Sequence, residues 1–272
     1  MVGKIEFMLM LTHTYLLQKY LEQTGEPSPA LDVYVYNIVP DLLTIHPDIN
    51  SAQTHDLRRS IKIPEEYPGA AYVLFHLLLD DLAHYGHICP DCREEFDPDS
   101  QGYSYIKGRP LIKPMLNLYK KSHREITYNE AAYRSHLIIE MLYDLAITTK
   151  INSSRTIELL ATAIEFTAKN KMPEFIRTMK WLYCLPDAQI IEVMKEAAVY
   201  LTIERMTMFM NMEGRINLYA NKFGAKTSEQ VLYAGVKDLF MQASILLEQD
   251  DDIFLRQSAK TIREYGWLPL AT

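Results

Sequence analysis

Histidine is missing from the second half of this chain, and glycine and cysteine are scarce throughout it. Of 272 residues, ten are glycine and three are cysteine. The scarcity of glycine, together with long stretches of leucine, methionine, alanine, glutamate and lysine, favours an all-α fold. Three cysteines provide no disulfide framework, so the chain does not have the composition of a disulfide-stabilised protein.

The chain also lacks an excess of basic residues. It has 28 lysines and arginines against 35 aspartates and glutamates, which gives a net charge of -7. This balance argues against binding nucleic acid through a basic face, so we expect no stable nucleic-acid partner. We find neither a signal peptide nor an apolar run long enough for a transmembrane segment. We therefore expect a cytoplasmic protein.

No glycine- or serine-rich linker divides the chain, which predicts one helical domain over residues 1–272. Within it we distinguish a half that contains all the histidines (1–150) and a histidine-free half (151–272). The segments 44–60 and 88–114 are predicted to be loops, the second of them a lid over a site. A break is predicted at Pro40, and Asn129 is predicted to cap the helix that follows it. Helices are expected over residues 6–23, 28–36, 70–87, 111–125, 129–149, 153–170, 173–185, 187–222 and 227–265.

One helical face in the segment 70–87 is polar, although the rest of that segment is apolar. His76, Asp80, His84 and His87 follow one another at i, i+4, i+8 and i+11, which places them on the same face. A helix that is apolar on its other sides is expected to be buried. A buried carboxylate beside imidazoles is unfavourable unless something pairs with it. A metal site is the simplest explanation.

A second polar stripe runs through the helix expected over residues 129–149. It consists of His136, Glu140 and Asp144, one helical turn apart and surrounded by apolar residues. Two helices that each carry His-x-x-x-carboxylate can face each other and bind metal ions. Imidazole and carboxylate suit zinc, and they also suit iron or manganese. The donors suffice for two or three ions.

The order of these residues along the chain resembles a known family, the all-helical zinc-dependent phospholipase C superfamily, which includes single-strand-specific nucleases. The resemblance covers residues 9–144 and rests on spaced ligands rather than on extended identity. The matching residues, in order, are His13, Asp41, His55, His76, Asp80, a further histidine, His136 and Glu140.

This resemblance implies a site with two or three zinc ions. The first ion would be bound by Asp41, His55, His76 and Asp80. The second would be bound by the further histidine together with His136 and Glu140. A third would lie between His13 and Asp80, which would bridge two ions. Asp41 also occupies the position of the general base in the family.

Two details of the ligand set stay open. Secreted members of the family also use their N-terminal amine at the third site, and without a signal peptide Met1 is not expected to do so. The further histidine normally comes six residues after the aspartate, whereas here His84 comes four and His87 seven residues after Asp80. We favour His87, because the backbone can bend at Gly86.

The residues next to these ligands are interpreted more simply. Asp144 is expected to orient an imidazole. Cys89-x-x-Cys92 is half of a zinc knuckle, but the chain has no second pair of cysteines. We interpret the two cysteines as unlinked thiols, with a separate His/Cys metal site as the alternative.

The resemblance thus implies a metal-dependent phosphoric-ester hydrolase, phospholipase C-like or a phosphodiesterase. Its substrate is a phosphate ester that could be a lipid, a nucleotide or a small molecule. The alternative is a non-catalytic helical protein that binds a metal or a partner. A di-iron carboxylate protein fits less well, because it would carry Glu-x-x-His pairs.

Overall fold

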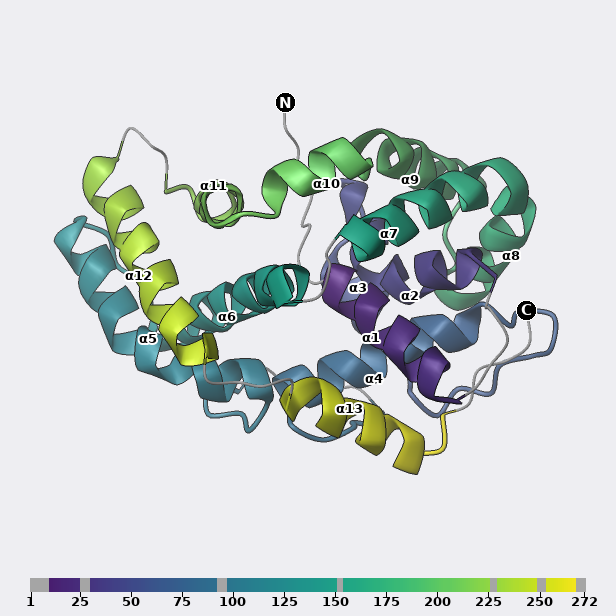
Figure 1. Cartoon of the computed structure of the whole chain (residues 1–272), viewed down its shortest axis with the longest axis horizontal. Helices are drawn as coiled ribbons and strands as arrows, with labels where there is room; N and C mark the ends of the chain where they lie inside the picture. Colours follow the sequence, from purple (N-terminus) through teal and green to yellow (C-terminus); the bar gives the residue numbers. More distant parts are fainter. Residues whose placement is uncertain are drawn as a thin grey trace.

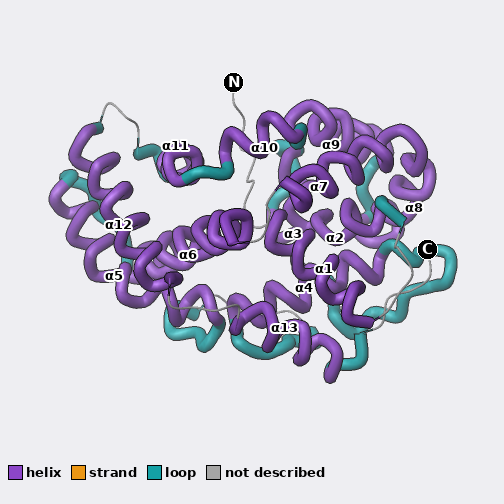
Figure 2. Tube along the Cα trace, viewed as in Figure 1, coloured by secondary structure: helices purple, strands orange, loops and turns teal. Residues whose placement is uncertain are grey.

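The computed structural model describes residues 10–24, 30–91, 97–150, 154–225, 229–248 and 253–267. Within these ranges all regular secondary structure is helical and no strand is present (Figure 2). The expected all-α fold is therefore confirmed. In chain order the helices are α1 (Met10–Thr24), α2 (Asp32–Leu42), the 3-10 helix η1 (Leu43–Ile45), α3 (Ser51–His55), α4 (Ala70–His84), α5 (Tyr103–Lys121), α6 (Tyr128–Lys150), α7 (Ser154–Phe166), the π-helix η2 (Thr167–Lys171), α8 (Met172–Tyr183), α9 (Asp187–Tyr200), α10 (Ile203–Phe209), α11 (Met212–Lys222), α12 (Gln230–Glu248) and α13 (Ile253–Glu264).

Helix α4 is buried along almost its whole length. Every residue from Ala70 to Ala83 is buried, as its apolar composition predicts. Helix α2 packs along it, and α1, α5 and α13 also contact it. The helix ends at His84, and Gly86 follows with a φ of 79°. Glycine adopts this left-handed conformation without steric strain, so the chain can turn sharply there.

Helices α5 and α6 form a closely packed pair next to α4. A Cβ atom on Gly108 would lie only 3.1 Å from the backbone nitrogen of His136, so glycine is what permits this approach. Helix α6 is capped by Thr127 rather than by Asn129. The Thr127 hydroxyl accepts from the Glu130 amide, and the Glu130 carboxylate accepts from the Thr127 amide. This reciprocal capping box starts the helix earlier than the sequence predicts.

The histidine-free half surrounds the first half rather than standing beside it. Helix α12 packs against α5 and α6, and α13 packs against α1 and α4 (Figure 1). Helix α7 contacts α1 and α2 on another side. The buried apolar side chains of both halves form one continuous cluster within the described residues. None of the described helices combines the length and the hydropathy that a membrane-spanning helix requires.

Several predicted helix boundaries are wrong. Helix α2 continues through Pro40, and η1 and α3 interrupt the loop expected over 44–60. The lid expected over 88–114 is helical from Tyr103 onward, although α5 contains Pro110 and Pro114. The helix expected over 187–222 is three helices, because Thr202 and Asn211 each cap a new start. The helix expected over 227–265 is divided into α12 and α13.

Candidate metal centre

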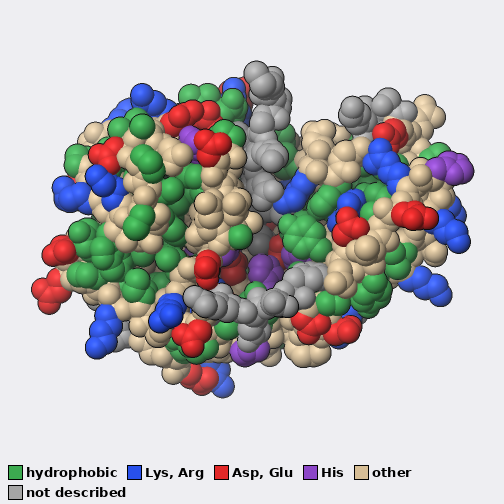
Figure 3. Space-filling view, turned by 180° about the vertical axis from the view of Figure 1, so that it is seen from behind, with side chains coloured by type: hydrophobic (Ala, Val, Ile, Leu, Met, Phe, Trp, Pro, Cys, Tyr) green, Lys and Arg blue, Asp and Glu red, His purple; other side chains and the backbone are tan. Residues whose placement is uncertain are grey.

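The predicted ligands come from five helices or their ends. His76 and Asp80 lie on α4, and His136 and Glu140 lie on α6. His13 comes from the first turns of α1, Asp41 from the end of α2 and His55 from the end of α3. Histidine and acidic side chains are visible in a hollow near the middle of the molecule (Figure 3).

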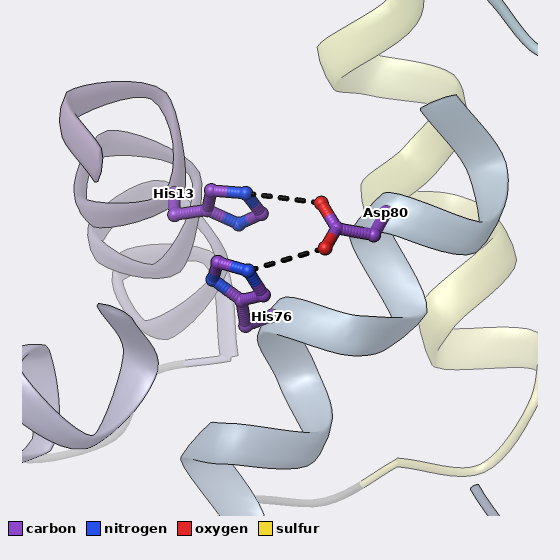
Figure 4. Close-up of side chains that lie close together, drawn as sticks. All are labelled: His13, His76 and Asp80. Atoms are coloured by element: carbon purple, nitrogen blue, oxygen red, sulfur yellow. Dashed lines mark ion pairs between the residues drawn. The ribbon is translucent and has the colours of Figure 1, made fainter. Parts of the chain in front are cut away.

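Asp80 faces two stacked histidines that come from different helices (Figure 4). Its Oδ1 lies 3.2 Å from Nε2 of His13, and its Oδ2 lies 3.2 Å from Nε2 of His76. The two imidazole rings stack with their centroids 3.6 Å apart. These three residues form one group in which each residue offers a ligand atom within 4.8 Å of the others. The two carboxylate oxygens thus lie close to imidazole nitrogens of different residues.

A second group joins the first through His76. It contains Asp41, His55 and His76, again with ligand atoms within 4.8 Å of one another. His55 Nε2 lies 3.8 Å from Oδ1 of Asp41 and 3.3 Å from Oδ2 of Asp80. The side chains of His55 and Asp41 are 27% and 21% exposed, so this group is open to solvent.

The third group contains His84, His136 and Glu140. His84 Nε2 lies 2.8 Å from Oε1 of Glu140, and His136 Nε2 lies 3.8 Å from its Oε2. Tyr105 stacks on the His136 ring at 4.4 Å between centroids and fixes its plane. His84 is the member that reaches solvent, with 29% of its side chain exposed.

His87 does not lie in this group. It follows the turn at Gly86 and is exposed, and its Nδ1 lies 3.2 Å from the carbonyl oxygen of Tyr85. The structure therefore places His84, not the favoured His87, beside His136 and Glu140. The last residue of α4 keeps the helical register of Asp80, whereas His87 leaves it.

The protonation states differ between the groups, and the third contains an imidazole that is protonated at pH 7. Burial lowers the pKa of His76 to about 3 and that of His136 to about 4, so both rings are neutral at pH 7. Burial raises the pKa of Asp80, but His76, His13 and His55 lower it more, so it stays ionised. Burial lowers the pKa of His84, but Glu140 raises it more, to about 9. A metal ion would displace that proton from His84.

The ring nitrogens that face these carboxylates are positioned to bind a metal. Nε2 of His76 lies 3.2 Å from Oδ2 of Asp80, and Nδ1 of His13, His76 and His136 has no hydrogen-bond partner among the described residues. The Nδ1 of His55 lies 2.8 Å from the Ser51 carbonyl oxygen, which can only accept, so Nδ1 is the donor in this contact and Nε2 faces Asp80 at 3.3 Å. An imidazole nitrogen beside a carboxylate oxygen is a pair that a zinc ion can bind.

A buried ion pair supports the first two groups and was missed in the sequence. Arg59 donates to both oxygens of Asp81, with Nη2 2.7 Å from Oδ1 and Nε 3.1 Å from Oδ2. Its Nη1 also donates to the carbonyl oxygen of His55 at 3.1 Å. Arg59 thereby fixes the backbone of His55 against α4. The available signal was Asp81 itself, a second carboxylate on a helix predicted to be buried.

The neighbouring residues differ in part from expectation. Asp144 bonds Thr12 and Arg215 rather than an imidazole. Cys89 is buried and not in a disulfide, and its amide donates to Asp81. Cys92 lies outside the described residues.

Comparisons of this chain with models of protein families, with curated proteins and with solved structures find no match.

Proposed function

We propose that this protein is a metal-dependent phosphoric-ester hydrolase, with zinc as its ion. The observation that carries the proposal is the position of Asp80. It lies within 3.3 Å of imidazole nitrogens from His13, His55 and His76, which belong to three different helices. A carboxylate shared in this way is suited to hold two ions close together. The third group of ligands, on α4 and α6, adds the capacity for a further ion.

The chain's own residues then have distinct roles. Bound divalent ions would supply positive charge for the phosphate oxygens and would acidify a water molecule. Asp41 is the candidate general base, because its carboxylate is partly exposed and lies at the open side of its group. It can accept the proton of the attacking water at a carboxylate oxygen. His84 is also partly exposed and can meet the substrate from the opposite group.

A small cavity lies next to Asp80 and Glu140 and is lined by polar and apolar side chains. Its volume of about 20 Å³ is room for about one water molecule, so it does not discriminate between ester classes. A lipid, a nucleotide and a small phosphate monoester remain the substrates to compare. The apolar residues of the lining are Leu79, Ala83, Tyr103, Ile139, Tyr143 and Phe254.

Metal analysis joined to a substrate panel tests this proposal. The purified protein is stripped with a chelator, refilled with zinc, and assayed on nitrophenyl phosphate mono- and diesters, a single-stranded oligonucleotide and phosphatidylcholine vesicles. We expect at least two bound zinc ions per chain and turnover of one ester class, lost on stripping and restored by zinc. Stoichiometric zinc without turnover would instead favour a non-catalytic metal-binding protein. Absence of bound metal would contradict both.

A further inference from the structure

A buried ion pair connects the histidine-free half to helix α6. Arg215 on α11 and Asp144 on α6 are 1% and 0% exposed, and Nη2 of the arginine lies 2.8 Å from Oδ2 of the aspartate. Removing two charges from water usually offsets most of their mutual attraction, so such a pair is weak evidence for stability alone. The second oxygen of Asp144 indicates what the pair does.

That oxygen binds the first turn of α1. The backbone amide of Thr12 donates to Oδ1 of Asp144 at 2.7 Å, and the Thr12 hydroxyl donates to the same oxygen at 2.6 Å. Amides in the first turn of a helix have no partner within the helix, and a negative charge is favourable there. Asp144 therefore caps α1 from another helix. Arg215 neutralises this buried carboxylate and holds its orientation.

His13 is the next residue after Thr12, and its ring stacks on His76 and contacts Asp80, both on α4. The ring is buried, and its Nε2 faces Asp80 at 3.2 Å. Its Nδ1 has no hydrogen-bond partner. By contrast, the His55 ring is held by the Ser51 carbonyl. The direction of the His13 ring therefore depends on where the backbone of the first turn of α1 lies.

We propose that Arg215 and Asp144 are positioning residues that set His13 against Asp80 through Thr12. The inference rests on the proposed metal centre and extends it into the half of the chain that has no histidine. In this proposal Asp144 holds the backbone of a helix that carries a ligand, and it does not orient an imidazole ring directly. In metal centres, residues that orient a ligand typically change metal affinity by about 10- to 100-fold when removed.

Zinc affinity measured by competition with a chromophoric chelator tests the inference. Thr12→Val removes the hydroxyl donor with little change in shape, and Thr12→Ser keeps it. We expect Thr12→Val and Arg215→Met to weaken binding of the same zinc ion that His13→Ala affects. For Arg215→Met we expect zinc affinity to fall about tenfold or more. Thr12→Ser is expected to bind zinc as the wild type does. Thr12→Val keeps the test usable if Arg215→Met does not fold.

A double-mutant cycle separates positioning from general destabilisation. In the His13→Ala background, Thr12→Val and Arg215→Met should cause no further loss of zinc affinity. Val193→Ala creates a cavity at a buried position of α9. It should lower the melting temperature and leave zinc affinity unchanged. Wild-type zinc affinity in Thr12→Val and Arg215→Met would overturn this inference but not the proposed function. The same holds if their effects on zinc affinity add fully to that of His13→Ala. A wild-type protein that binds no zinc would overturn the proposed function itself.

Discussion

Asp80 and Asp81 are consecutive carboxylates on one buried helix, and they contact different partners. Among the described residues, the close polar side-chain contacts of Asp80 are imidazoles, whereas Asp81 accepts from Arg59 and from the Cys89 amide. Adjacent residues on a helix point about 100° apart, so one turn can serve a metal site and an ion pair.

Asp80→Asn should therefore reduce zinc binding and turnover with little loss of apoprotein stability. The amide keeps the shape of the carboxylate but not the charge that faces three imidazoles. We expect activity to fall by several orders of magnitude, because two ligand groups share this residue. Zinc content, turnover and the melting temperature of the stripped protein check this. Unchanged zinc content and turnover would contradict the proposed centre.

Asp81→Asn is the matched control at the neighbouring position. It leaves the buried guanidinium of Arg59 without its charged partner, which costs about 3–5 kcal/mol for a pair of this kind. We expect a lower melting temperature with and without zinc. Equal melting temperatures for the Asp81→Asn and Asp80→Asn apoproteins would contradict the assignment of a stabilising ion pair to Asp81 and of metal binding to Asp80.

His84→Ala and His87→Ala form a second matched pair. Only His84 lies within ligand distance of His136 and Glu140, so His84→Ala should lose the zinc ion of that group. His87→Ala should bind zinc and turn over substrate as the wild type does, because His87 is exposed beyond the end of α4. Zinc stoichiometry by elemental analysis decides between them. The reverse result would identify His87 as the ligand, as expected from the possible bend at Gly86.

The residues of the candidate site differ in how well the sequence predicted them. Pairs such as His76–Asp80 and His136–Glu140 show a local signature, because helical periodicity places i and i+4 side by side. The choice of His84 depended on where α4 ends, and that end is set by the positive φ of Gly86. Arg59 has no such signature, because its partner is 22 residues away and is met only through folding.

At the scale of elements, the prolines explain the largest errors. Proline in a sequence predicts the end of a helix, because it lacks an amide donor and its ring clashes with the preceding turn. Helix α2 nevertheless contains Pro40, and nearly all of its residues are buried. Pro110 and Pro114 in α5 are one turn apart on one face, while α5 buries its other face against α6 and α12. The burial of these helices compensates for the hydrogen bonds that proline removes. This packing cannot be predicted from local sequence propensity.

The start of α2 gives a pH-dependent prediction. Asp32 is buried there, its Oδ1 has no hydrogen-bond partner within the described part of the chain, and burial raises the pKa of its carboxyl above 3.8. The folded state thus holds a proton that the unfolded state has released, so stability falls as pH rises from 3.8 through the folded pKa. Asp32→Asn removes this loss. We expect it to raise the melting temperature by about 2–4 °C near pH 7, equivalent to about 1 kcal/mol.

Melting curves of the wild type and of Asp32→Asn between pH 4 and pH 7.5 check this prediction. The difference between the two proteins should shrink as the pH falls, because wild-type Asp32 then gains its proton in the folded state. A constant difference across this range would mean that the effect is steric and does not come from the buried charge.

At the scale of the whole molecule, the two halves are tied together at the candidate centre. All ligands come from residues before 141, but Arg215 reaches Asp144 from α11, and Phe254 on α13 lines the cavity beside Asp80. The partners of these contacts are 71 or more residues apart in the chain, so no local pattern could show them. The histidines thus indicate which part of the chain supplies the ligands. They do not indicate how much of the chain contributes to the site.

Removal of the metal should loosen the helices that donate ligands while sparing the others. A ligand present at 100 times its dissociation constant stabilises the folded state by about 2.7 kcal/mol, so a chelator should lower the melting temperature by about 5–10 °C. Helix α3 should respond most in hydrogen exchange, because five residues are too few for a helix to be stable by itself. It is otherwise held by its capping box, by the Tyr183 hydroxyl on the Thr54 carbonyl and by Arg59 on the His55 carbonyl. Helices α8 and α9 carry no ligand, so their protection should persist at the same temperature. Uniform loss of protection across the described helices, or none at α3, would mean that metal ions do not cross-link the ligand-bearing helices as the positions of His13, Asp80 and His55 predict.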